Sequence, residues 1–360
     1  MFVADLHNDL VQRIMIGEDI SKLTSNGHTD IPRLKNSSIN LEVLIIWVSN
    51  KSNNFKYFEK ANLMYDKLES LGSIESVVVP KNINDILDIY NKNQLLLPIS
   101  IEGGEALENK IENLYHFIER GLLYFGPTWN HSLDWVSSAY DETHHKSSLK
   151  TFGLDEFGIK VLKTCEENNV VVDVSHIGEK SFWDIYKNSS KPFIASHSSV
   201  DRICPHYRNL KDDQLKAIKE KKGIVGINPY PFFIDPTFEK REKNIRKKFK
   251  KNLEEIDNKF SDKYEQWLNK QHFLQIKLSN IAPDISVFID HIDYVVNLIG
   301  IDYVGIGSDY DGLDCLPKGW KDCQDHIKIS QKLDQRGYKT NDIEKIMGRN
   351  FIRVLETINY

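Results

Sequence analysis

Short, nearly continuous apolar runs recur along this chain, and longer segments with helical spacing lie between them. Runs of this kind are typical of parallel strands that are covered on both faces. The segments 56–72, 105–121 and 153–169 carry apolar residues at the spacing of an amphipathic helix. The eight predicted strands lie at residues 2–7, 41–50, 95–104, 122–130, 169–176, 192–197, 223–230 and 302–309.

The alternation of eight strands with helices predicts an α/β protein with the (β/α)8 architecture of a TIM barrel. A doubly wound open sheet is the alternative, but no G-x-G-x-x-G motif follows a predicted strand. Barrels near this length fold as one unit, so we expect a single domain over residues 1–360.

One segment departs from the alternation. More than seventy residues separate the last two predicted strands, far more than a connection needs. Apolar residues recur there at helical spacing, and the stretch 240–252 is strongly basic, as the solvated face of a helix often is. We expect a helical insertion over about 236–283, a pair of helices that covers the barrel mouth or joins a homodimer. Its predicted buried stripe consists of Ile245, Phe249, Ile256 and Phe260.

The composition is that of an ordinary globular protein, with 40% hydrophobic and 28% charged residues. The net charge of −5 gives no sign of a nucleic-acid partner or of an acidic membrane surface. No signal-peptide pattern opens the chain and no run of about 18 apolar residues occurs, so we expect a cytoplasmic protein without a membrane partner. The four cysteines form no C-x-x-C pair, which favours buried reduced thiols.

Residues able to bind metal or move protons follow several predicted strands. In "ADLHNDL", His7 and Asp9 are two positions apart, so an extended chain points both side chains to one side. The carboxyl ends of barrel strands open on a single face, which brings residues from different strands together. The residues at the other strand ends are Glu102, His176, His197, Asp309 and Asp311.

Each of these residues alone has a structural explanation, such as a helix cap or a turn. Together, three histidines and several carboxylates on one rim cost several kcal/mol each to bury unless something pairs them. A pair of divalent cations would pair them all. Histidine and carboxylate ligands without thiolates suit Zn²⁺, with Mn²⁺, Co²⁺ or Fe²⁺ as substitutes. Two such ions would activate a water and polarise a carbonyl, which is the chemistry of amide hydrolysis.

The motifs that carry this chemistry resemble those of the membrane (renal) dipeptidases, peptidase family M19, in a bacterial cytoplasmic form. The resemblance covers nearly the whole chain outside the insertion and rests on several ordered motifs. These are "DLHNDL" (5–10), "IEGGEAL" (101–107), "GLDEFGIKVL" (153–162), "VVDVSHIGEKSFWDI" (171–185), "PFIASHSSVDRICPHYRNL" (192–210), "HIDYVVNLIGIDYVGIGSDYDGL" (291–313) and "DIEKIMGRNFIRVL" (342–355).

The resemblance implies two Zn²⁺ ions per chain. His7, Asp9 and Glu102 would bind the first ion. Glu102 would also bridge to the second ion, which His176 and His197 would complete. A metal-bridging hydroxide would then attack the peptide bond.

The resemblance also implies the residues that contact substrate. Arg208 would bind the C-terminal carboxylate, since a planar guanidinium suits bidentate contact with a carboxylate. Asp309 would contact the amino end and move the proton. Asp311, beside Gly312, is expected to turn towards the rim. Tyr230 is a further predicted substrate contact.

Two positions depart from the family pattern. Better-known members carry a substrate-contacting histidine where this chain has Trp129, with His131 two residues further on. Either Trp129 contacts the substrate or His131 acts as the catalytic donor to the oxyanion. Phe233 stands where the family has a pocket tyrosine.

The sequence therefore predicts a zinc-dependent dipeptidase that acts on dipeptides, including those with a C-terminal D-residue. A deacylase of N-acyl amino acids needs the same metals and the same carboxylate clamp, so it stays open. A non-catalytic metal-dependent binding protein is less favoured, because every expected ligand is present.

Overall fold

The computed structural model describes residues 1–48, 56–261 and 263–359. Eight parallel strands form a closed barrel, in the order β1, β10, β9, β8, β7, β6, β5, β2 and back to β1. This closure confirms the predicted (β/α)8 barrel over the open sheet. The barrel strands are β1 (Ala4–Asn8), β2 (Leu41–Trp47), β5 (Ile99–Glu102), β6 (Leu122–Gly126), β7 (Val171–Asp173), β8 (Phe193–Ala195), β9 (Ile224–Ile227) and β10 (Val304–Ile306).

The third predicted strand is divided. The range 95–104 contains β4 (Leu95–Leu96) and β5, with Pro98 between them, which has no N–H to donate to a neighbouring strand. Strand β4 pairs with the start of β2 and with β3 (Val77–Val78), a short strand that the apolar pattern does not predict. The second predicted strand, 41–50, ends as β2 at Trp47, and its last two positions lie outside the described residues.

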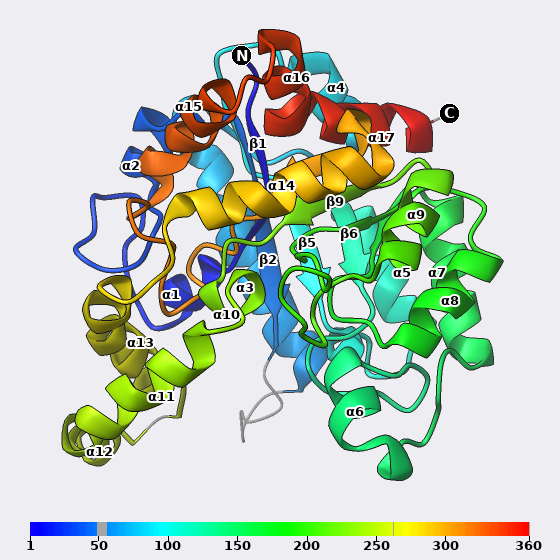
Figure 1. Cartoon of the computed structure of the whole chain (residues 1–360). Coiled ribbons are helices and arrows are strands. Elements are labelled where there is room, and N and C mark those ends of the chain that lie inside the picture. Colours follow the sequence, from blue (N-terminus) through cyan, green and yellow to red (C-terminus); the bar gives the residue numbers. More distant parts are fainter. Residues whose placement is uncertain (49–55, 262, 360) are drawn as a thin grey trace.

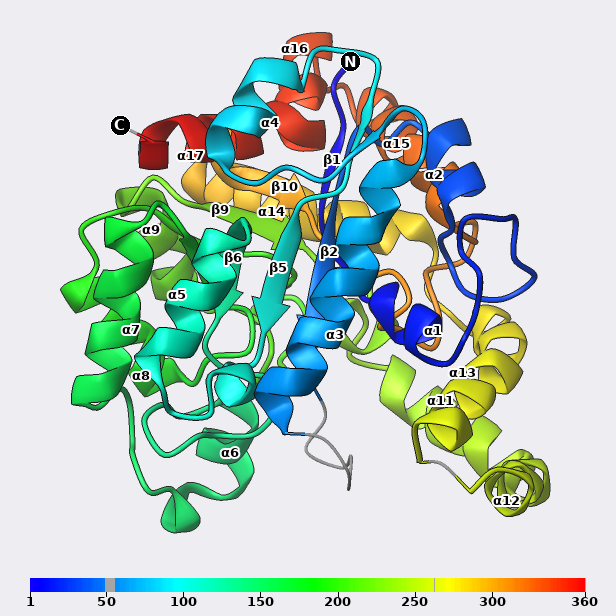
Figure 2. The same cartoon turned by 180° about the vertical axis from the view of Figure 1, so that it is seen from behind.

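Helices surround the barrel, as both views show (Figures 1 and 2). The predicted helices at 56–72, 105–121 and 153–169 are present as α3, α5 and α7. Local capping fixes where such helices begin, since the Asp155 side chain accepts the backbone N–H of Gly158 at the start of α7. The outer helices are α3 (Tyr57–Glu69), α5 (Ile111–Glu119), α7 (Glu156–Glu167), α8 (Glu179–Asn188), α9 (Asp212–Glu220), α14 (Ile285–Ile299) and α17 (Asn350–Asn359).

Shorter helices fill the connections and the amino-terminal end of the barrel. They are α1 (Val11–Met15), α2 (Ile31–Asn36), α4 (Ile83–Ile89), α6 (Ala139–His144), α10 (Pro231–Ile234), α15 (Ile327–Gln335) and α16 (Thr340–Glu344). The chain termini and α17 lie at the end of the barrel opposite to α6 and the insertion (Figures 1 and 2). Among the described residues, no helix combines the length and apolar character that a membrane crossing requires.

Strand residues alternate between two apolar clusters. Leu44 and Ile46 of β2 pack into the cluster shared with the outer helices, whereas Val43 and Ile45 belong to the cluster inside the barrel. Phe351 of α17 joins the inner cluster. Complete burial of each such side chain stabilises the fold by roughly 1.5–3 kcal/mol. The rigid barrel therefore holds the strand ends that carry the candidate site.

The insertion contains three helices where the apolar stripe predicts a pair. They are α11 (Phe238–Lys248), α12 (Lys250–Lys259) and α13 (Lys263–Ser279), and they project beside the barrel with α12 at the tip (Figures 1 and 2). Phe238, Leu274 and Leu278 form a small core with Cys315, and Ile245 packs against it. The two helices expected from the stripe become three because a break at Phe249 separates α11 from α12.

The insertion is attached to the loops at the carboxyl ends of two strands. Gln275 of α13 lies 3.0 Å from His28, side-chain nitrogen to Nε2, and His28 lies in the connection after β1. Arg246 of α11 donates to Asp314, which follows β10, at 2.9 Å. The insertion therefore flanks the rim of the barrel, and its role in a homodimer stays a prediction. All four cysteines are buried and free, as expected.

Candidate metal centre

The five predicted metal ligands come together at the carboxyl ends of four strands. Glu102 is the last residue of β5, and its Oε1 lies 3.0 Å from His176 Nε2, 3.4 Å from His197 Nε2 and 3.7 Å from His7 Nε2. His7 Nε2 lies 3.8 Å from Asp9 Oδ2. One carboxylate oxygen thus faces three imidazole nitrogens, and a second carboxylate adjoins one of them.

Two of the atoms that face one another at this centre lack hydrogen-bond partners, and two ring nitrogens, His176 Nε2 and His197 Nε2, lie only 3.0 Å apart. The atoms that lack a partner here are His7 Nε2 and Glu102 Oε1, and both are buried. Burial first, and then the charge of Arg208 and the neighbouring imidazoles, hold the pKa of His7, His176 and His197 well below the ordinary value, which favours the neutral form of the rings. The bare nitrogens and the carboxylate would repel one another unless a cation lay between them. This donor set therefore fits divalent metal ions.

The contacts of the outer ring nitrogens leave the Nε2 atom of each histidine directed at the centre. Tyr124 donates its hydroxyl proton to the carbonyl oxygen of Leu6 at 2.8 Å, so its oxygen accepts from His7 Nδ1 at 2.9 Å. His176 Nδ1 contacts Asn130 Oδ1 at 3.2 Å, and His197 Nδ1 contacts Ser196 Oγ at 2.8 Å. A proton on Nδ1 leaves Nε2 with the lone pair that a metal ligand needs.

Asp309 lies beside this centre, three residues after the end of β10. One oxygen each of Asp309 and Asp9 lies within 4.8 Å of a ring nitrogen of His7. Burial first, and then the nearness of the two carboxyls, raises the pKa of Asp9, and burial raises the pKa of Asp309. Gly312 permits this arrangement, since a Cβ there would lie 2.3 Å from both Asp309 Oδ1 and Asp9 Oδ2.

Asn228, which follows β9, orients Asp309. Its side-chain Nδ2 donates to Asp309 Oδ2 at 3.0 Å and leaves Oδ1 without that bond. Sequence reasoning did not select Asn228, because it lies within the predicted strand 223–230, whereas the observed β9 ends one residue before it.

Arg208 places a buried positive charge next to the centre. Only 3% of its surface is exposed, and its Nε has no hydrogen-bond partner. Its Nη1 and Nη2 make only long bonds, 3.4 Å to Ser198 Oγ and 3.3 Å to the His197 carbonyl oxygen. Burial lowers the pKa of this guanidinium. Such an arginine has free donors for an anionic group, as the carboxylate-binding role requires.

The predicted substrate contacts lie around Arg208 and His176. The Trp129 ring is 6.4 Å from the His176 ring and 4.5 Å from the Trp47 ring, between centroids. The Tyr230 ring lies 5.1 Å from that of Phe233, whose centroid is 5.5 Å from Arg208 Cζ. These aromatic rings border the charged groups.

His131 lies apart from the metal ligands. Its side chain is 47% exposed, and its Nδ1 lies 3.9 Å from Asp141 Oδ1. The Trp129 ring, 6.1 Å from the ring of His131, is the one that neighbours His176. The structure therefore does not bring His131 together with the five ligands, and its predicted catalytic role is without support from this geometry.

The sequence predicts that Asp311 turns towards the rim, but the structure buries its side chain. It is only 5% exposed, and it accepts hydrogen bonds from Arg13 Nη1 at 3.1 Å and from the Thr29 hydroxyl at 2.7 Å. The backbone N–H of His28 donates to its other oxygen at 2.5 Å. Asp311 stays buried because the buried Arg13 guanidinium pairs with its carboxylate.

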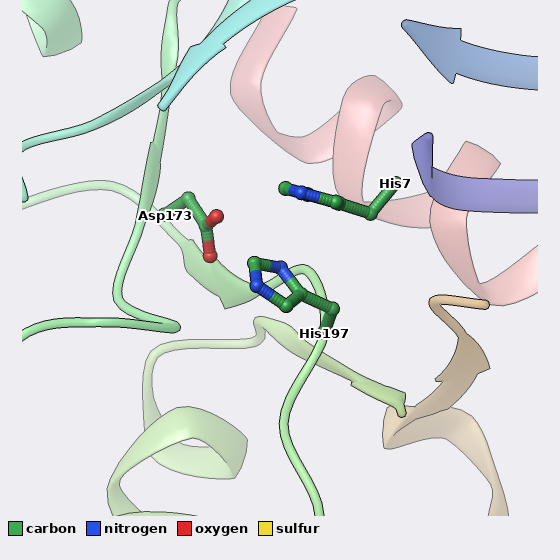
Figure 3. A group of neighbouring side chains, drawn as sticks. All are labelled: His7, Asp173 and His197. Carbon is green, nitrogen blue, oxygen red and sulfur yellow. The ribbon is translucent and has the colours of Figure 1, made fainter. Parts of the chain in front are cut away.

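Sequence reasoning also missed the residues that hold the histidines. Asp173 lies within 4.8 Å of both His7 and His197, ligand atom to ligand atom, and Figure 3 shows its carboxylate near both rings. Ser196 and Asn130 contact histidines directly, as described above. Their positions in the sequence could have indicated two of them. Asp173 stands three residues before His176 in "DVSH", and Ser196 stands directly before His197 in "ASH".

A family model for the membrane dipeptidases, peptidase family M19, matches residues 1–360. The chain belongs to this family. It is therefore an enzyme of a metal-dependent dipeptidase family, and the motifs that indicated the resemblance are confirmed.

Individual members of the family and solved structures share 20–22% of their residues with this chain in the following comparisons. Dipeptidase 3 of Homo sapiens is 22% identical over 366 residues, which cover 99% of this chain and 65% of that protein. The probable dipeptidase PvdM from Pseudomonas aeruginosa superposes with a TM-score of 0.80 at 20% identity, over 99% of this chain and 95% of that one. A metallopeptidase from Rhodobacter sphaeroides, liganded with a phosphinate mimic of L-Ala-D-Ala, gives a TM-score of 0.78 at 21% identity, over 99% of both chains. These superpositions support the barrel fold.

Proposed function

We propose that this enzyme is a zinc-dependent dipeptidase with two metal positions. His7, Asp9 and Glu102 hold the first ion, and Glu102, His176 and His197 hold the second. The observation that carries the proposal is the position of Glu102 Oε1, buried and unpartnered within 3.7 Å of three imidazole nitrogens. Mn²⁺, Co²⁺ or Fe²⁺ would suit the same oxygen and nitrogen donors.

The bound metals would polarise the scissile carbonyl and supply a hydroxide nucleophile. Arg208 holds the C-terminal carboxylate of the substrate through its free guanidinium donors. Asp309 Oδ1 takes the proton of the attacking water and returns it to the leaving amine nitrogen. Asn228 keeps the other oxygen of Asp309 engaged meanwhile. Trp129, Tyr230 and Phe233 border the substrate.

A buried arginine clamp restricts the substrates to very short peptides. The carboxylate must reach Arg208 while the peptide bond lies at the metals, so a longer C-terminal extension would have no space. Dipeptides with a C-terminal D-residue fit the proposal, because the Rhodobacter sphaeroides relative of the same fold carries a mimic of such a dipeptide.

Turnover of matched substrates tests this function. The zinc-loaded protein is expected to hydrolyse Ala–Ala and L-Ala–D-Ala, and to discriminate strongly against the amide of Ala–Ala, which lacks the carboxylate. Arg208→Ala should abolish that discrimination while leaving the metal content unchanged. If N-acetyl-Ala is hydrolysed and the dipeptides are not, the enzyme is a deacylase of N-acyl amino acids. If none is turned over, the binding-protein interpretation gains support.

We further propose that the enzyme is a cytoplasmic homodimer. We place the contact on the insertion, which projects beside the barrel and exposes Ile276 of α13. Light scattering should give twice the chain mass of 41.8 kDa. A mass of one chain at micromolar concentration would contradict the dimer.

A further inference from the structure

One hydroxyl group contacts two of the metal-site histidines. Ser196 Oγ lies 2.8 Å from His197 Nδ1 and 3.3 Å from His7 Nδ1. These histidines belong to different metal positions in the proposed centre, since His7 serves the first ion and His197 the second. The Ser196 hydroxyl therefore lies where it influences both positions at once.

The direction of these hydrogen bonds follows from the number of protons. A hydroxyl has one proton and two lone pairs. Ser196 donates its proton to Asp173 Oδ2 at 2.6 Å, so its oxygen is left to accept. His197 Nδ1 must then be the donor to Ser196, and the one Nδ1 proton of His7 is shared between Tyr124 at 2.9 Å and Ser196 at 3.3 Å. Both rings consequently present an unprotonated Nε2 towards Glu102.

Asp173 is held in place as an acceptor. Its Oδ1 accepts the Ser175 N–H at 3.1 Å, the Ser175 hydroxyl at 2.7 Å and the Ser196 N–H at 2.8 Å. With Ser196 Oγ on its other oxygen, the buried carboxylate has four donors. Asp173 lies beside both rings (Figure 3) and reaches their Nδ1 atoms through Ser196. Glu102 faces their Nε2 atoms, so Asp173 serves as a positioning residue and not as a third ligand.

We propose that the Asp173–Ser196 pair fixes the tautomer of His7 and His197 together and thereby links the occupation of the two metal positions. The other partners of Nδ1 lack this property, because Tyr124 contacts only His7 and Asn130 contacts only His176 among these histidines. This inference rests on the proposed metal centre. In it, Asp173 and Ser196 act through the histidines and contact neither the metal nor the substrate.

Asp173→Asn tests the role of the Asp173–Ser196 pair without changing the shape of the side chain. The three donors around Oδ1 keep the amide oxygen in that place, so the new Nδ2 faces Ser196 and donates to its oxygen. Ser196 then gives its own proton to His197 Nδ1, and the ring proton moves to Nε2, where it faces Glu102. An isosteric Asp→Asn change beside a histidine is known to produce this wrong tautomer in serine proteases.

Two readouts apply to the full-length variant. Nitrogen-15 spectra of the metal-free protein should show a protonated Nε2 on His197, whereas the wild type shows a protonated Nδ1. Competition with a chromogenic chelator should show roughly 10–100-fold weaker Zn²⁺ binding, the usual effect of a lost outer partner. Ser196→Ala should weaken both positions, and Tyr124→Phe, the matched control, should weaken only the position that contains His7.

The outcomes separate this inference from the proposed function. If wild-type protein binds no zinc, the function fails, while the spectra of the metal-free protein still test the tautomers. If Asp173→Asn and Ser196→Ala leave the tautomers and both affinities within a factor of two of the wild type, the positioning role is wrong. If Asp173→Asn does not fold, Ser196→Ala decides by the same two readouts. Equal weakening by Tyr124→Phe at both positions would overturn the link.

Discussion

Two clusters of buried charged residues lie side by side at the carboxyl ends of β1 and β10, and they differ in how the protein pairs them. In the metal centre, Glu102 Oε1 and His7 Nε2 are buried without hydrogen-bond partners. In the second cluster, which we call the Arg13 cluster (Arg13, Glu18, Thr24, His28, Thr29 and Asp311), the guanidinium donates to Glu18, Thr24 and Asp311 at 2.6–3.1 Å.

The difference shows that burial and charge alone do not mark a functional site. Burial by itself would raise the pKa of Asp311, but Arg13 and His28 hold it below its ordinary value. For Glu102 the charge of Arg208 offsets only part of the effect, and burial followed by Asp9 raises its pKa well above the ordinary value. A charge that the protein pairs stabilises the fold, whereas one left unpaired is available to a ligand.

The largest expected effect is that of Glu102→Gln. This change removes the carboxylate shared by both proposed metal positions. Hydrolysis should fall by more than the roughly 10⁴-fold that a single proton-moving group contributes. The metal-free variant should unfold at the same denaturant concentration as the wild type or at a higher one, because it removes a buried unpaired charge. A variant that kept both metals and most of its activity would place the centre elsewhere.

Asp309→Asn should have the next largest effect. It leaves the five ligands in place but removes the base, so kcat should fall by about 10²–10⁴-fold with little change in KM and with two metals still bound. Steady-state kinetics and metal analysis of the same sample check this. Near-normal turnover would mean that another group moves the proton.

Asp311→Asn should do the opposite of Glu102→Gln. Breaking this buried ion pair leaves the Arg13 charge with only the partly exposed Glu18 as a carboxylate partner, so the free energy of unfolding should fall by up to roughly 3–5 kcal/mol. Metal content and kcat should stay close to those of the wild type at temperatures where the variant is folded. Urea unfolding checks the first part. A free energy of unfolding within 1 kcal/mol of the wild-type value would contradict the claim that the Arg13 cluster stabilises the fold.

His291 provides a smaller, pH-dependent test. This buried histidine of α14 accepts the Val200 N–H and lies 3.1 Å from the Ile234 carbonyl oxygen, and burial lowers its pKa to about 4. The unfolded chain binds this proton near pH 6.5, so folding stability falls as the pH drops from about 6.5 to about 4. At about 1.4 kcal/mol per pKa unit, the loss is on the order of 3 kcal/mol.

His291→Gln isolates that contribution from the other acid effects. Glutamine offers one donor and one acceptor but does not titrate, so the wild type should be more stable at pH 7. The difference between the two proteins should shrink towards pH 4, measured by denaturant unfolding across that range. A difference that does not change with pH would contradict the assignment.

The sequence was sufficient for the barrel and for the convergence of the ligands. Apolar runs mark buried strands, and barrel geometry then places residues that follow those strands, such as Glu102 and His197, on one face. The sequence was not sufficient to predict the roles of residues whose partners lie far away along the chain. Asp311 and Asp309 stand in the same turn, and only the approach of Arg13, 298 positions away, separates their roles. Asp173 likewise acquires its place from Ser196 of the next strand.

The break between α11 and α12 shows a similar limit. The apolar stripe continues through Phe249 at helical spacing, so periodicity predicts a pair of helices but no break at this position. At the break, Phe249 packs against Phe273 of α13, with ring centroids 5.7 Å apart. Such a contact depends on the folded arrangement of the insertion.

The most direct test of the central claim is a zinc titration of the metal-free protein. A buried centre in which two of the facing atoms lack partners should bind two Zn²⁺ ions per chain, and the melting temperature should rise with the concentration of free zinc. His176→Ala should bind one ion fewer, whereas Asp311→Asn should still bind two. At most one tightly bound ion in the wild type after reconstitution, without a rise in melting temperature, would contradict the account.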